Sequence, residues 1–162
     1  MLPVHRKLSP GEWRLLRHMR LTALTDSPAA FLAAYEDECR YSEEEWRAEF
    51  GRGEWIIGEI GGHPVSLVGV TREPGAPDSE RYLEYMWVEP GYRRSHVAIK
   101  MLAAIFSDLK ESGVRTVFLW VLDGNRAAVQ LYQQLDFVST AERQRLTIRP
   151  ESFEERFRLD LT

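Results

Sequence analysis

The chain has 162 residues, of which 44% are hydrophobic and 28% are charged, and its 25 acidic and 21 basic residues give a net charge of −4. These values predict one folded domain over residues 1–162, and they exclude a disordered or low-complexity chain. The acidic balance argues against a nucleic-acid partner. The single cysteine, Cys39, excludes an internal disulfide and a zinc site built on paired cysteines, and we expect no bound metal.

The N-terminus lacks the apolar stretch of a signal peptide. The longest apolar runs, such as residues 117–122, are far shorter than the roughly 20 residues that span a bilayer. We therefore expect a soluble, cytoplasmic protein with no membrane partner.

The N-terminal part reads as helical. Residues 9–12, Ser-Pro-Gly-Glu, are typical of a helix start, and apolar residues then follow one helical stripe until residues 25–28 end it. Residues 29–41 are expected to mix loop and short helix. A second capping box at residues 42–45 predicts another helix.

Strand patterns follow. Two apolar runs, residues 55–60 and 65–70, flank a Gly-Gly pair and predict a hairpin, and residues 82–88 predict the next strand. The strongest helix pattern begins near Ser95 and is closed by Gly113.

The C-terminal part alternates strands and helices. Residues 116–122 form a continuous apolar run, typical of a strand that is covered on both faces. Residues 125–135 predict a helix, and strands are expected from residue 137 and at the end of the chain. The order β-α-α-β-β-β-α-β-α-β-β predicts an α/β (α+β) domain with a mixed sheet.

The turn into the long helix is a candidate anion site. A helix start presents free N–H groups and partial positive charge, and Arg93 and Arg94 add two full charges there. An ordinary turn with a solvated arginine pair explains the same residues. The Gly-Lys-Ser/Thr of a P-loop and the Gly-x-Gly-x-x-Gly of a dinucleotide fold are both missing.

Two sequence blocks resemble the GCN5-related N-acetyltransferase (GNAT) superfamily. Residues 86–98 resemble its acyl-CoA motif, Gln/Arg-x-x-Gly-x-Gly/Ala after a strand ending Val-x-Pro, with Arg93 and Ala98 at the motif's ends. Residues 122–137 resemble its Asn-x-x-Ala-x-x-Leu-Tyr-x-x-x-Gly-Phe block. Residues 20–31 are similar to the opening helix and loop of one subgroup.

The resemblance implies a GNAT-like mixed, mostly antiparallel sheet with a V-shaped splay, flanked by helices on both faces. It implies acetyl-CoA as co-substrate and an N-acetyltransferase that moves the acetyl group to a primary amine by direct attack. The acceptor would be a small-molecule or peptide amine. Many relatives are homodimers, and the last strand with residues 143–153 offers a dimer contact.

The resemblance also implies donor-site roles. The backbone N–H of Val88 would stabilise the oxyanion, and the N–H groups of residues 93–98 would hold the pyrophosphate. Asn125 would orient the pantetheine arm or a nearby backbone, and Tyr132 would protonate the leaving thiolate, unless it is a core tyrosine. The implied donor-binding set is Trp87, Val88, Arg93, Arg94, Ser95, His96, Val97, Ala98, Asn125, Ala128 and Tyr132.

The acceptor amine must lose a proton before it attacks, so a general base is expected. Glu84 is the first candidate because it lies four residues before Val88 on one strand, which predicts a shared face. A solvent-facing glutamate explains it equally well, and Glu36 and Glu38 are second choices. We expect the acceptor to contact Phe31, Tyr35 and Glu36.

The sequence departs from the family pattern at glycine positions. His96 and Arg94 stand in the acyl-CoA loop where the family has glycine, and Asp136 stands in the second block. A left-handed backbone at His96 would cost about 1–2 kcal/mol. Donor binding is either intact or weakened, and the second case would make the chain a non-catalytic CoA-binding or sensor domain. A ligand-free interaction domain would leave both blocks unexplained.

Overall fold

The computed structural model describes residues 2–31, 33–147 and 149–162. Within these residues one sheet has seven strands in the order β1-β2-β3-β4-β5-β7-β6. The strands are β1 Val4–Lys7, β2 Gly53–Ile60, β3 His63–Thr71, β4 Glu80–Val88, β5 Thr116–Leu122, β6 Val138–Arg145 and β7 Phe153–Asp160. The helices are α1 Trp13–Asp26, α2 Tyr35–Glu38, α3 Glu43–Phe50, α4 Val97–Glu111 and α5 Arg126–Gln134. The predicted mixed α/β class is confirmed, and the element order differs from the prediction by one short helix, α2, in the segment expected to mix loop and short helix.

Local signals set the helix starts. At α3, the Ser42 Oγ accepts a hydrogen bond from the Glu45 N–H at 3.2 Å, and the Glu45 carboxylate accepts one from the Ser42 N–H at 2.6 Å. This is the reciprocal capping box that the sequence predicts. The first predicted helix instead opens with a short 3-10 turn, Pro10–Glu12, before α1.

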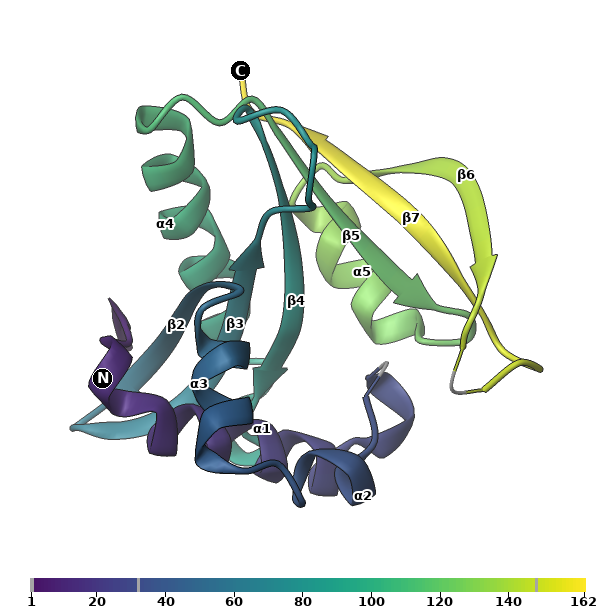
Figure 1. Cartoon of the computed structure of the whole chain (residues 1–162). Coiled ribbons are helices and arrows are strands. Elements are labelled where there is room, and N and C mark those ends of the chain that lie inside the picture. Colours follow the sequence, from purple (N-terminus) through teal and green to yellow (C-terminus); the bar gives the residue numbers. More distant parts are fainter. Residues whose placement is uncertain (1, 32, 148) are drawn as a thin grey trace.

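Helices cover both faces of the sheet (Figure 1). The apolar stripe of α4 packs with α5 against inward-facing residues of β3, β4, β5 and β7. On the other face, α1 and α3 pack against β2, β3 and β4 through the aromatic core residues Trp46, Trp55 and Trp87. No helix in the described part of the chain is long and apolar enough to span a membrane.

The sheet divides between β4 and β5. These parallel strands pair only between residues 80–82 and residues 116–118, and beyond that point they separate into the V seen in Figure 1. The rest of each strand therefore keeps backbone groups on this edge without a strand partner. The expected V-shaped splay is present.

A β-bulge in β4 changes which side chains share a face. Glu84 pairs with Gly69, but Trp87 pairs with Leu67, so two residues of β4 oppose one of β3, and Tyr85 has a positive φ of 56°. The extra residue reverses the alternation, because side chains change face at every residue. The prediction that Glu84 shares the face of Val88 is therefore wrong. Glu84 shares the face of Trp87.

Candidate active site

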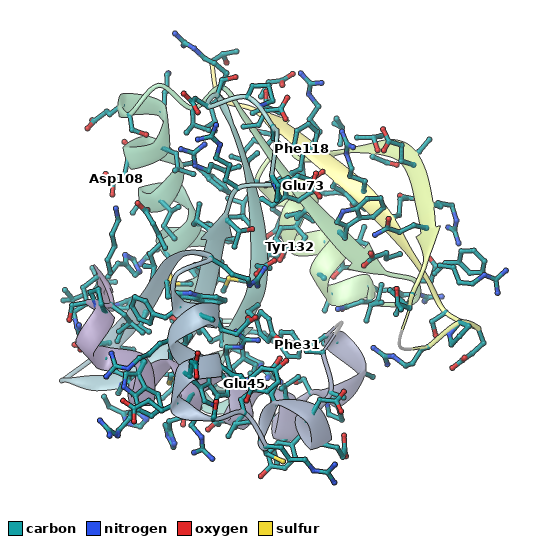
Figure 2. The ribbon with its side chains drawn as sticks, viewed as in Figure 1. Phe31, Glu45, Glu73, Asp108, Phe118 and Tyr132 are labelled. Carbon is teal, nitrogen blue, oxygen red and sulfur yellow. The ribbon has the colours of Figure 1, made fainter. Side chains whose placement is uncertain are left out.

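A cavity of about 470 Å³ lies where β4 and β5 separate. Its walls come from α1, the segment after α1, α2, α3, β4, β5 and α5. Figure 2 shows Tyr132 on the α5 side and Phe31 below it, on the segment after α1. Of the residues singled out from the sequence, the cavity brings together Phe31, Glu84, Asn125, Ala128 and Tyr132. Residues far apart in the chain thus meet in the splay.

Tyr35 and Glu36 lie elsewhere. They line a separate depression beside Arg149, and Tyr35 is 41% exposed. Glu38, two residues after Glu36 on α2, lines the cavity instead. On this short helix only Glu38 is buried, so the face that points inward decides which acidic residue reaches the site.

Tyr132 lies in the last turn of α5. It is 8% exposed and packs edge to face against Phe137, with ring centroids 5.5 Å apart. Burial raises the pKa of Tyr132 above the ordinary tyrosine value, which keeps its hydroxyl protonated at neutral pH. Asn125 caps the same helix, because its Oδ1 accepts the Ala128 N–H at 3.2 Å. Tyr132 is therefore a core side chain that also faces the cavity.

A series of charged side chains lines the side of the cavity formed by α1, α2, α3 and β4. Arg20 donates from Nη2 to Glu38 Oε2 at 2.7 Å and from Nη1 to Glu49 Oε2 at 2.8 Å. Arg52 contacts Glu49 at 3.1 Å and also pairs with Glu84. Glu84 thus ends an alternating series of carboxylates and guanidiniums.

Burial and charge oppose each other in this series. Burial by itself would raise the pKa of Glu49, but Arg20 and Arg52 more than offset it and hold that pKa below its usual value. Burial raises the pKa of Tyr85, whose hydroxyl accepts from Arg20 at 2.9 Å and donates to Glu38. The Arg20 guanidinium also lies 4.1 Å from the centre of the Tyr85 ring. The Glu49 carboxylate therefore stays charged although it is partly buried.

The sequence reasoning missed most of this network. Arg20, Glu49 and Arg52 were not predicted as site residues. Arg20 carried one usable signal, because it lies among the apolar residues of α1, next to Met19 and one turn after Leu16, and it is only 2% exposed. A charged residue on a buried stripe indicates a buried partner, although it does not identify that partner.

The turn before α4 is a cradle of backbone N–H groups. Arg94 and His96 have positive φ values of 60° and 64°, while Arg93 has a φ of −71°, so the backbone alternates in hand and forms a nest. Within the described residues, the N–H groups of residues 94–99 have no hydrogen-bond acceptor, and the helical bonds begin with Lys100 to His96 at 3.0 Å. This geometry suits an anion. Arg94, His96 and Asp136 stand where the family pattern has glycine. All three have a left-handed backbone, with a φ of 68° at Asp136.

The side chain of Arg93 points away from that cradle. Its Nε donates to the Val88 carbonyl at 2.8 Å, and its guanidinium pairs with Asp26 at the end of α1. Asp26 also accepts the Trp87 Nε1–H at 3.0 Å. Arg93 and Trp87, both predicted at the donor site, therefore use their side chains to connect this turn to α1.

The amide of Val88 faces the splay. The next residue, Glu89, donates its N–H to the Val65 carbonyl of β3 at 2.8 Å. Because successive residues of a strand direct their N–H groups to opposite edges, the Val88 N–H points away from β3 and toward the gap beside β5. A backbone donor is thus available at the point where the sequence analysis placed it.

The comparisons with known proteins agree with this fold. Residues 18–137 match the Acetyltransferase (GNAT) family. The ribosomal-protein-S18-alanine N-acetyltransferase of Escherichia coli has a similar structure, with a TM-score of 0.73 and 19% identity over 99% of this chain and 95% of that one. An N-acetyltransferase of Staphylococcus aureus Mu50 gives 0.79 and 16% over 100% of both chains.

A third similar structure, yncA from Salmonella typhimurium with its cofactor acetyl-CoA, has a TM-score of 0.79 and 13% identity, over 100% of this chain and 95% of that one. At these identities the likeness concerns the fold. Compared with curated protein sequences, the chain has no match.

Proposed function

This chain belongs to the GNAT acetyltransferase family, and from that premise we propose that it transfers an acetyl group from acetyl-CoA to a primary amine by direct attack. The observation that carries the proposal is the cavity in the splay. It joins a buried, protonated tyrosine to a set of carboxylates, and its β4 wall leads to the free N–H groups before α4.

Residues of the turn before α4 fit the donor. The free N–H groups of residues 94–99 suit a pyrophosphate, and the αL positions at Arg94 and His96 give the cradle its shape. Arg93 would hold the turn through Asp26 instead of binding phosphate with its side chain. Acetyl-CoA, when bound, supplies the activated thioester.

The chain's own groups then serve the transfer. The Val88 N–H would donate to the acetyl carbonyl oxygen as negative charge develops there. The C–N bond forms while the C–S bond breaks, and the Tyr132 hydroxyl would give its proton to the leaving sulfur. Glu84 would receive the proton from the acceptor ammonium, directly or through water, because it is the most exposed carboxylate of the network at 31%.

The assignment of Glu84 has its own test. Glu84→Gln should shift or remove the acidic limb of the pH–rate profile, because the amide cannot accept a proton. An unshifted profile would assign the base to another group. Of the two second-choice residues, Glu36 and Glu38, Glu38 is the one that lines the cavity.

Calorimetric titration with acetyl-CoA and with CoA tests the donor. We expect micromolar binding of both ligands, on the order of −8 kcal/mol. No binding at millimolar donor would overturn the acetyltransferase proposal.

The second candidate function is that of a non-catalytic CoA-binding domain. It rests on Arg94 and His96, which have a left-handed backbone and stand where the family pattern has glycine, the residue that adopts this backbone without strain. Tight donor binding with no turnover over a broad panel of amines would favour it.

A further inference from the structure

The charge of the cavity carries a statement about the acceptor. Its charged lining residues are the carboxylates of Glu38, Glu49 and Glu84 and the guanidiniums of Arg20 and Arg52. Three negative groups against two positive groups leave a formal charge of −1. Both guanidiniums are already bound by carboxylates. The described lining therefore has an excess of carboxylate charge, which favours a cationic ligand.

One oxygen of these carboxylates lacks a hydrogen-bond partner among the described residues. Glu38 is 1% exposed, and its Oε2 binds Arg20 and the Tyr85 hydroxyl. Its Oε1 is buried with no hydrogen-bond partner in the described chain, as is the Nε of Arg20. A buried carboxylate oxygen left unpaired is costly, so a residue in this position indicates a missing donor.

The rest of the wall also favours a cation. Aromatic rings line the same cavity, and they are Phe31, Tyr41, Tyr82, Tyr85 and Trp120. Phe31, which lies below Tyr132 in Figure 2, stacks on Tyr85 with ring centroids 5.5 Å apart. Aromatic faces attract alkylammonium groups, and their apolar area accommodates a methylene chain.

We propose that the acceptor is a small dicationic amine, whose reacting amine faces the splay near Glu84 while its second cationic group binds beside Glu38 and Glu49. This proposal rests on the proposed acetyl transfer and names the acceptor class for the same cavity. The second cation would supply the donor that Glu38 Oε1 lacks and would neutralise the surplus charge. An acceptor with a distal carboxylate is rejected, because both guanidiniums are engaged.

Arg52 has a special place in this arrangement. It is 44% exposed, far more than Arg20 at 2%, and it bonds to Glu84 and to Glu49, one of the carboxylates that would hold the second cation. Arg52 therefore competes with the ligand for Glu49. Removing its charge should strengthen the preference for a dication, whereas removing a carboxylate should weaken it.

The test is initial-rate kinetics with acetyl-CoA and three amines of similar length. The amines are 1,4-diaminobutane, pentylamine and 4-aminobutyrate, which end in an ammonium, a methyl and a carboxylate group. We expect kcat/KM for the diamine to exceed that for pentylamine by about tenfold or more, and aminobutyrate to be the poorest acceptor. Equal or better use of pentylamine overturns the inference.

Two variants with opposite expected signs separate recognition from structural damage. Arg52→Gln should raise the diamine-to-pentylamine ratio about tenfold, and Glu49→Gln should lower it about tenfold. If Glu49→Gln fails to fold, Arg52→Gln decides alone, and an unchanged diamine-to-pentylamine ratio in that variant overturns the inference. Parallel changes for both amines in both variants overturn the inference.

Failure of the inference differs from failure of the proposed function. Acetyl-CoA binding without acetylation of any of the three amines overturns the dicationic acceptor and leaves donor binding standing. Faster acetylation of a peptide N-terminus than of the diamine also overturns it. Absence of acetyl-CoA binding overturns the acetyl transfer itself.

Discussion

The turn before α4 and the acceptor side of the cavity are built in opposite ways. The turn offers backbone N–H groups from residues 94–99, and its side chains point elsewhere, as Arg93 does toward Asp26. The acceptor side offers side chains, chiefly the buried Arg20 and its carboxylate partners. A backbone cradle tolerates a histidine in place of glycine at the cost of strain, whereas a side-chain network is changed by any single substitution. We therefore expect the donor site to be robust and the acceptor site to be particular to this chain.

The largest effect should come from the centre of the side-chain network. Arg20→Met leaves Glu38 buried without its cation, and we expect the free energy of unfolding to fall by about 3–5 kcal/mol. Urea unfolding measures this change. Arg52→Met is the matched control, because Arg52 is 44% exposed, and it should cost less than about 1 kcal/mol. Similar losses in the two variants would contradict the distinction between a buried centre and an exposed end.

The second effect concerns catalysis at the boundary of the two sites. Tyr132→Phe removes only the hydroxyl, so kcat should fall about 100-fold as proton donation is lost. The Kd of acetyl-CoA should stay within about twofold, because the turn before α4 is untouched. Turnover and calorimetry on the same preparation check both values. An unchanged kcat would remove Tyr132 from the general-acid role.

The third effect is a pH dependence with a defined sign. Burial raises the pKa of Tyr132 above its ordinary value of 10.0, so above that pH the unfolded chain loses a proton that the folded chain keeps. The contribution of Tyr132 to the free energy of unfolding is therefore fully present below pH 10 and is lost as pH rises. The free energy of unfolding should be lower by about 1.4 kcal/mol at pH 11.

Urea unfolding at pH 9 and pH 11 measures this loss. Tyr132→Phe should show a smaller loss than the native chain, because its remaining groups titrate alike. An identical loss in both proteins would mean that Tyr132 ionises freely in the folded state.

The smallest effect tests how far the turn depends on backbone alone. His96→Gly should raise the free energy of unfolding by about 1 kcal/mol, because glycine adopts a φ of 64° without strain. Donor affinity should stay the same or improve. His96→Ala is the control, since it removes the imidazole but keeps the strain. Equal stability of the two variants would show that the imidazole, and not the backbone, sets the cost.

Signals that act over short stretches of chain were readable from the sequence. The capping box at Ser42, the stripe of α4 and the buried run of β5 all depend on spacing within one element, and each formed where it was predicted. Asn125 and Tyr132 lie on one helix, so their arrival at the same cavity also follows from local spacing. The family blocks were informative for the same reason.

Only the tertiary structure decided the rest of the site. The bulge at Tyr85 placed Glu84 and Val88 on opposite faces of β4, because one extra residue reverses every later side chain. Arg20, Glu38 and Glu49 come from three different helices, and no periodicity links them. Secondary structure is determined largely by neighbouring residues. A buried charge network depends instead on which distant groups the packing brings within about 3 Å of one another.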